Sequence, residues 1–151
     1  IGNIGFHPTK LPKSRGRAPL AWLTYRKEAG AATFFLINNE LVTPPLGGTI
    51  LPGVTRDSVI QIAKHWKLKI IERPITIDEV IHETQNGHLK EAFAAGTAAV
   101  ISPVGTIGYR GKDYIVDEVQ IGALSQKLYD EITGIQYGRR EDPFGWRIKI
   151  A

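Results

Sequence analysis

The pattern of apolar and polar positions predicts a succession of short strands and longer helices. Runs rich in aromatic and β-branched residues are typical of strands. Such runs occupy residues 21–25, 33–39, 40–46, 68–75, 89–95, 99–104 and 144–150. Asn38 and Asn39 predict a turn between the second and the third of these strands, and residues 109–116 predict a hairpin.

Helices are predicted where apolar residues recur at helical spacing. One stripe begins after Thr55 and follows the i, i+3, i+4, i+7 pattern at Val59, Ile62, Ala63 and Trp66. A last amphipathic helix has its apolar positions at Leu124, Leu128, Ile132 and Ile135.

A further helix is predicted from a capping box. Thr76 is followed three positions later by Glu79, the spacing at which the two residues cap each other's backbone N–H groups. This helix should run to about Gln85 and stop at Gly87. Strands and helices alternate without internal repeats, so the fold class is α/β or α+β.

The composition is that of an ordinary globular protein. With 151 residues, 42% of them hydrophobic and 23% charged, the chain suffices for one domain with a core. No apolar run approaches the roughly 20 residues that a membrane-spanning helix needs, so we expect no membrane partner. The absence of cysteine excludes disulfides and thiolate chemistry. Because the chain begins at Ile1 and contains no methionine, we expect it to be part of a longer polypeptide.

The positive charge is concentrated in residues 1–27. This segment holds 6 of the 19 basic residues and no acidic one, whereas the remaining 13 basic residues face 15 acidic residues. A basic arm can bind nucleic acid or an anionic surface. The proline and glycine residues of the segment are also typical of a solvated connector. We favour the connector and expect no nucleic-acid partner.

A run of small residues raises the question of what approaches the backbone there. Residues 94–99 read Ala-Ala-Gly-Thr-Ala-Ala, with Gly96 and Thr97 at the centre. Small side chains let a ligand approach the backbone closely. A tight bend between two packed strands needs small residues as well. The residues alone favour the bend, and the ligand site stays open as the alternative.

A second candidate site lies at 51–58, where Gly53 precedes a predicted helix. The N–H groups of Val54 and Thr55 and the positive end of the helix dipole favour an anion there. Thr55 or Asp57 could instead simply cap the helix. If this turn converged with the turn at Thr97, their N–H groups and hydroxyls could hold one phosphate. Neither turn has the glycine spacing of a P-loop or a dinucleotide-binding loop.

Few other residues suggest chemistry. Glu28 heads an apolar strand, where its carboxylate could hold a cationic ring nitrogen or pair with Arg26 or Lys27. The four histidines lack metal-ligand spacing, so we expect no metal site. No serine lies in the context of a hydrolase nucleophile.

Three separated segments of the chain have a distinctive sequence: ELVTPPLGGTILPGVTRDSVIQIAK at 40–64, EAFAAGTAAVISPVG at 91–105 and ITGIQYGRREDPFGW at 132–146. Together they resemble branched-chain amino acid aminotransferases, which are pyridoxal 5′-phosphate enzymes of the class IV aminotransferase family. The resemblance implies the large-domain fold of the family, an α/β (α+β) mixture of strands and helices that forms a pseudo-barrel. It also implies two parts: a basic, poorly matching segment at 1–27, and a C-terminal cofactor-binding domain at 28–151 without the small N-terminal domain.

The resemblance further implies roles for the candidate residues. Val54, Thr55 and the Thr97 hydroxyl would hold the cofactor phosphate, and Glu28 would lie beside the pyridine nitrogen and keep it protonated. The small-residue turn would therefore be a binding turn and not merely a bend. The substrate carboxylate would be held by Gly96, Thr97 and Ala98.

Several family features are missing from the chain. The lysine that forms the family's Schiff base with the cofactor would fall directly before Ile1, and none of the ten lysines present matches it. The family's phosphate-binding arginine lies in the absent small domain. Ala31 stands where many members have threonine. The catalytic lysine is therefore expected outside this chain.

The function implied by the resemblance is transamination of leucine, isoleucine and valine with 2-oxoglutarate. The expected partners are amino acids, 2-oxo acids and a second copy of the chain, in the cytoplasm or, in a eukaryote, the mitochondrion. A D-amino acid aminotransferase or an aminodeoxychorismate lyase of the same fold is an alternative, against which the ending at 132–146 argues. A non-catalytic remnant that binds through its basic arm is the other.

Overall fold

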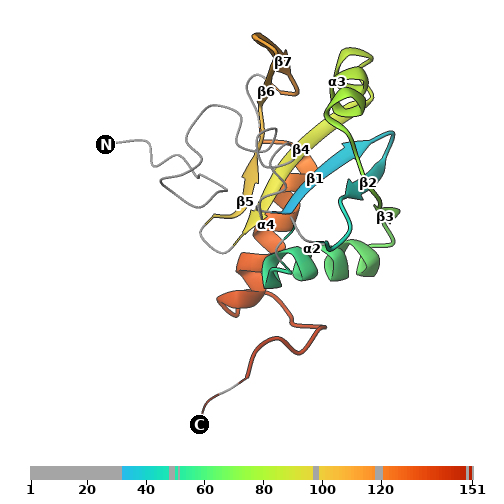
Figure 1. Cartoon of the computed structure of the whole chain (residues 1–151). Helices are drawn as coiled ribbons and strands as arrows, with labels where there is room; N and C mark the ends of the chain where they lie inside the picture. The colour runs from blue at the N-terminus through green and yellow to red at the C-terminus, as the bar shows by residue number, and fades with distance from the viewer. Residues whose placement is uncertain are drawn as a thin grey trace, which may run out of the picture.

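The computed structural model describes residues 32–47, 50, 52–96, 99–117, 121–148 and 150 (Figure 1). The predicted strand at 21–25 and the basic segment at 1–27 lie outside the described residues. So do three of the candidate site residues, Glu28, Thr97 and Ala98.

A five-stranded sheet forms the centre of the fold, in the order β3-β2-β1-β4-β5. Neighbouring strands in the sheet are antiparallel, except for β2 and β3, which are parallel. The strands are β1 (Ala32–Ile37), β2 (Glu40–Thr43), β3 (Ile70–Glu72), β4 (Leu89–Gly96) and β5 (Val100–Pro103). A separate hairpin consists of β6 (Thr106–Tyr109) and β7 (Lys112–Ile115).

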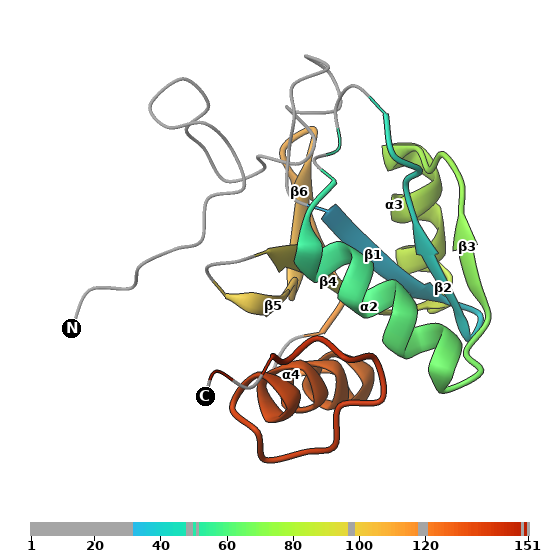
Figure 2. The same cartoon turned by 90° about the horizontal axis from the view of Figure 1, so that it is seen from below.

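Helices cover both faces of the sheet. The helices α2 (Val54–His65) and α4 (Ala123–Gln136) lie beside each other on one face (Figure 2). On the other face, α3 (Ile77–Gln85) and the hairpin pack against the sheet. The strand β1 therefore contributes to two cores: Phe34 is buried with α2 and α4, whereas Phe35 is buried with α3. Burial on both faces explains why this strand is a continuous apolar run.

Two tight turns have the backbone that the sequence predicts. Asn38 and Asn39 join β1 to β2 with φ values of +50° and +64°. Arg110 and Gly111 join β6 to β7 with φ values of +50° and +75°. Two consecutive positive φ angles are typical of the hairpin turns whose twist matches that of paired strands.

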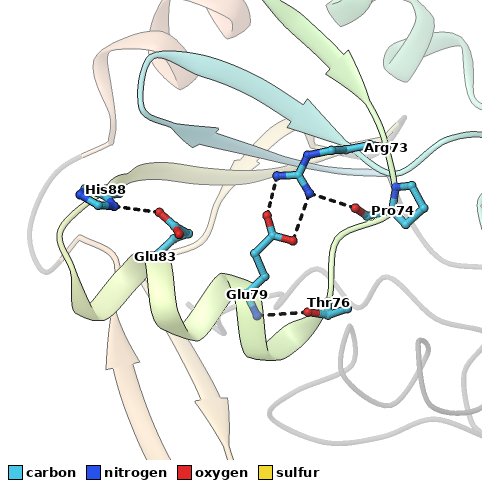
Figure 3. A network of polar contacts seen from close by, with 6 residues as sticks. All are labelled: Arg73, Pro74, Thr76, Glu79, Glu83 and His88. Atoms are coloured by element: carbon cyan, nitrogen blue, oxygen red, sulfur yellow. Dashed lines mark hydrogen bonds and ion pairs between the residues drawn. The ribbon is translucent and has the colours of Figure 1, made fainter.

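The predicted capping box of α3 is confirmed in part (Figure 3). The Thr76 hydroxyl accepts a hydrogen bond from the Glu79 backbone N–H at 3.1 Å. The Glu79 carboxylate, however, accepts hydrogen bonds from both terminal guanidinium nitrogens of Arg73, with Nη1 at 3.0 Å. This pair lowers the pKa of Glu79 and raises that of Arg73, because the hydrogen bond between them favours both charged forms. At the other end of the helix, His88 Nδ1 lies 2.9 Å from the Glu83 carboxylate.

A side chain of β4, the carboxylate of Glu91, binds the N-terminus of α4. Glu91 accepts the backbone N–H groups of Leu124 and Ser125 at 2.9 Å each, and the Ser125 hydroxyl at 2.8 Å. It therefore satisfies the first turn of a helix more than 30 positions away in the chain. A side chain on Gly122, the N-cap residue, would overlap the Glu91 carboxyl group.

The prediction of a terminal strand at 144–150 is wrong, since the described residues of this segment form no strand. Asp142 accepts the backbone N–H groups of Phe144 and Arg147 at 3.2 and 2.7 Å, which leaves them unavailable to a sheet. The rings of Phe144 and Trp146 stack with centroids 4.4 Å apart and pack on the core beside α2. Of the apolar residues at alternate positions, Phe144 and Trp146 thus pack as rings, whereas Ile148 and Ile150 are exposed.

The mixed strand-and-helix class is confirmed by these elements. Within the described part of the chain, no helix is long and apolar enough to cross a membrane.

Candidate functional site

The sheet topology brings the candidate motifs to one end of the sheet. The first residue of β1, Ala32, pairs with Ala95, so β1 begins where β4 ends. The strand β2 runs antiparallel to β1 and ends at Thr43, after which the chain leads into α2. We call this end, defined by Ala32, Thr43 and Gly96, the site end. In both views the start of α2 lies on the same side as the start of β1 and the end of β4 (Figures 1 and 2).

The first turn of α2 presents backbone N–H groups at the site end. Its N-cap is Gly53, which has no side chain with which to accept them. The first backbone bond into the helix runs from the Asp57 N–H to the Gly53 carbonyl at 3.1 Å. The N–H groups of Val54 and Thr55 precede that bond and thus lack an acceptor within the helix. Val54 is 84% exposed and Thr55 is half-buried.

The candidate site has two arms: the first turn of α2 is one, and the turn after β4 is the other. Gly96 is half-buried and pairs with Val100, which begins β5. Val100 has φ +59°, a left-handed conformation that a β-branched residue rarely adopts. Such backbone strain persists only where the surroundings demand it and is frequent at binding sites. The strand β5 thus begins at a residue with a strained backbone, directly opposite the end of β4.

Buried polar groups also gather at the site end. The Thr43 hydroxyl donates to the Thr33 carbonyl at 2.8 Å, and this link between β2 and β1 is buried. Two buried side-chain atoms of the described chain have no hydrogen-bond partner: Thr33 Oγ1 and Arg56 Nε. Unpaired buried groups are uncommon in folded proteins and require an explanation. Both atoms belong to residues at the site end, next to the motifs that were singled out from the sequence.

Arg56 supplies a cation that the sequence analysis missed. It is 4% exposed although it lies in the first turn of α2. Its Nη2 atom donates to the Pro44 carbonyl at 3.0 Å and to the Glu72 carboxylate at 2.7 Å. A basic residue in the first turn of a helix opposes the helix dipole. That conflict was the available sequence signal, because such a residue is retained only where something compensates for it.

These donors fit a phosphate group. Free N–H groups at a helix N-terminus, the Thr55 hydroxyl and a buried guanidinium together make a region rich in donors and positive charge. The unpaired Arg56 Nε is consistent with a region that an additional acceptor would complete. Among the described residues, no group of three or more His, Asp or Glu side chains could hold a metal ion.

The structure thus describes only some of the predicted site residues. Val54, Thr55 and Gly96 lie at the site end as two separate arms. Glu28, Thr97 and Ala98 lie outside the described residues. Their described neighbours, Ala32 and Gly96, nevertheless belong to paired strands that meet at this end.

Comparison with known proteins points to a single family. Residues 27–107 match the family model described as amino-transferase class IV. The chain is 45% identical over 148 residues to "Branched-chain-amino-acid aminotransferase 2" of Bacillus subtilis, covering 94% of the chain and 41% of the relative. It is 47% identical over 127 residues to "Branched-chain-amino-acid transaminase 1" of the same organism, covering 83% and 36%. The chain thus spans about two-fifths of the length of the curated relatives that it matches.

Solved structures give the same picture. The branched-chain amino acid aminotransferase from Escherichia coli matches with a TM-score of 0.64 and 29% identity, covering 79% of this chain and 38% of that one. The branched-chain aminotransferase from Thermoproteus uzoniensis, solved with norvaline, matches with a TM-score of 0.62 and 33% identity, covering 78% and 35%. Sequence and fold therefore agree over most of the chain.

Proposed function

The chain belongs to the class IV aminotransferase family, and we propose that it is the cofactor-binding part of a branched-chain amino acid aminotransferase. The enzyme would transfer the amino group of leucine, isoleucine or valine to 2-oxoglutarate. The observation that supports the proposal is that β1 begins where β4 ends, with the start of α2 on the same side of the sheet. The names of the relatives support branched-chain substrates over the other activities of the family.

In this proposal, the chain's own residues hold and orient pyridoxal 5′-phosphate. The backbone N–H groups of Val54 and Thr55 and the hydroxyls of Thr55 and Thr97 would donate to its phosphate. Each charge-assisted hydrogen bond of this kind contributes roughly 1.5–3 kcal/mol. When bound, the cofactor supplies an electron sink for the amino-acid substrate. Glu28 would keep a proton on the ring nitrogen.

The turn after β4 would orient the substrate. The N–H groups of residues 97 and 98, next to Gly96, would donate to the substrate carboxylate and so set the amino acid's orientation. The strained Val100 would keep these donors in place, because preorganised groups need no rearrangement when the ligand arrives. The small side chains around Gly96 would let the ligand approach the backbone.

Part of the machinery is expected outside this chain. The catalytic lysine, the family's phosphate-binding arginine and the small domain would be supplied by further sequence. The 28–151 domain assignment, the homodimer and the substrate partners belong to the same proposal. The 151 residues alone would thus bind the cofactor weakly.

The phosphate site can be tested without catalysis. Pyridoxine 5′-phosphate and pyridoxine differ by the phosphate and have no aldehyde to react with lysines. We define the phosphate advantage as the dissociation constant of pyridoxine divided by that of pyridoxine 5′-phosphate, both measured by fluorescence titration. We expect a clear advantage for the chain as it is. Thr55→Val should lower it by about 10-fold, the loss of one such hydrogen bond.

Thr106→Val is the matched control, because Thr106 is exposed on the hairpin and lies on a different element. It should leave the phosphate advantage unchanged. Equal binding of the two pyridoxine compounds by the unaltered chain would contradict the assignment of the phosphate site.

A further inference from the structure

Arg56 connects three segments that are far apart in the sequence. It lies in the first turn of α2, directly after Thr55, and its side chain is 5% exposed. One nitrogen, Nη2, donates both to Pro44 just after β2 and to Glu72 at the end of β3. The side chain therefore fixes the start of α2 to the ends of two strands, across the loop between β2 and α2.

The contacts are of the kind that fix orientation. A guanidinium is planar, so binding two acceptors defines the direction of the side chain as well as its position. The helix start is otherwise weakly fixed, since its N-cap is Gly53 and makes no side-chain capping bond. In α3, by contrast, the N-cap Thr76 accepts a hydrogen bond from the helix. Arg56 thus restrains the first turn of α2, which has no side-chain cap.

The electrostatics at this turn favour an anion nearby. Arg56 brings a positive charge to the positive end of the helix dipole, which is unfavourable. Its carboxylate partner among the described residues, Glu72, has a side chain that is 41% exposed and partly screened by water. The Nε donor has no partner among the described residues. A phosphate at the adjacent N–H groups would offset the remaining charge.

We propose that Arg56 is a positioning residue for the cofactor phosphate. By anchoring the first turn of α2 to Pro44 and Glu72, it holds the N–H groups of Val54 and Thr55 in the direction that a phosphate needs. The inference rests on the proposed function, because it takes the ligand of the site end to be pyridoxal 5′-phosphate. Beyond the proposed function, the inference assigns a role to Arg56, whose direct partners are the Pro44 carbonyl and the Glu72 carboxylate.

The test compares the phosphate advantage of the chain with that of Arg56→Met, again by titration with pyridoxine 5′-phosphate and pyridoxine. We expect the advantage to fall by about 10-fold or more, the effect of losing at least one well-directed charge-assisted hydrogen bond. Pyridoxine binding should change little. A purely structural role would weaken both ligands alike and leave their ratio unchanged, which would overturn the inference.

Arg73→Met is the matched control for charge. Arg73 also pairs with a carboxylate, that of Glu79, but its partner lies on α3. It should leave the phosphate advantage unchanged. An equal loss in both variants would assign the effect to net charge and overturn the inference.

Glu72→Gln provides a second variant, because a partly exposed carboxylate can be replaced without emptying the core. We expect it to lower the phosphate advantage by about 3-fold, since both acceptors of Arg56 are then neutral and hold it less firmly. If Glu72 did not help to position Arg56, the loss of its negative charge would strengthen phosphate binding instead. An increase in the phosphate advantage of Glu72→Gln would therefore contradict the inference. If the unaltered chain shows no phosphate advantage, the proposed function itself fails. If it shows one that Arg56→Met retains, only the inference on Arg56 fails.

Discussion

Val100 has a strained backbone conformation that should affect the stability of the fold. Its φ of +59° places an L-residue in the left-handed region, at a cost of roughly 1–2 kcal/mol. The side chain is half-buried against the core that contains Phe34 and Phe93, which offsets part of this cost. Relief of this strain should therefore be measurable in the free energy of unfolding.

We predict that Val100→Gly costs less stability than the same change at a valine with ordinary backbone angles. Val116 is the matched control, since it is also half-buried and does not have a positive φ. Because glycine adopts positive φ freely, Val100→Gly should lose at least about 1 kcal/mol less of the free energy of unfolding than Val116→Gly. Urea denaturation of both variants measures this difference. An equal or larger loss at Val100 would contradict the strain.

The start of α3 shows how an element can depend on pH. The Arg73 hydrogen bond depresses the pKa of Glu79 in the folded state. A depressed carboxylate pKa stabilises the fold above the unfolded-state pKa, and this contribution disappears as the pH falls through the folded-state value. Both side chains are about one-third exposed, so water screens the pair.

We therefore predict that Glu79→Gln lowers the free energy of unfolding at pH 7 by on the order of 0.5–1 kcal/mol, as is usual for exposed ion pairs. The deficit relative to the unaltered chain should shrink as the pH is lowered from about 5 towards 2, where Glu79 is protonated and resembles glutamine. Urea denaturation across this range provides the measurement. Glu141→Gln, which removes an exposed carboxylate near the C-terminal end, should show no comparable pH-dependent deficit. A deficit that persists unchanged at low pH would exclude the ion pair as its cause.

Elements defined by nearby residues were predictable, and elements defined by distant partners were not. The cap of α3 depends on Thr76 and Glu79, three positions apart, and the turn at Asn38 and Asn39 depends on its own two residues. In contrast, the predicted strand at 68–75 is reduced to β3, since only residues 70–72 pair with β2. The apolar alternation at 144–150 could not distinguish a strand from two stacked rings.

The same distinction holds for the candidate site. The N-terminus of α2 was identifiable because Gly53, Val54 and Thr55 are consecutive. Arg56 was not identified as a site residue, because its partners at positions 44 and 72 become visible only once β2 and β3 are paired. That β4 ends beside the start of β1 likewise becomes visible only from the antiparallel pairing of these two strands.

At the scale of the whole molecule, we propose a division of the chain between the basic segment at 1–27 and a cofactor-binding domain at 28–151. The described residues carry both cores and the two arms of the site. Because the chain spans about two-fifths of its curated relatives, a working active site would have to be completed by further sequence. The expected completions are a lysine directly before Ile1 and the small domain with its arginine.

The final prediction follows from this division. The 151-residue chain should not transfer amino groups from leucine to 2-oxoglutarate, since none of its ten lysines matches the family's catalytic lysine, which would move the proton. General acid–base help alone is typically worth about 10²–10⁴-fold. A longer chain that carries the lysine should show this transfer. In that longer chain, Glu28→Gln should lower turnover far more than cofactor retention, because glutamine cannot hold a proton on the ring nitrogen as well as a carboxylate does. Glu141→Gln should change neither quantity. Robust turnover by the 151 residues alone would mean that one of their ten lysines serves as the catalytic base.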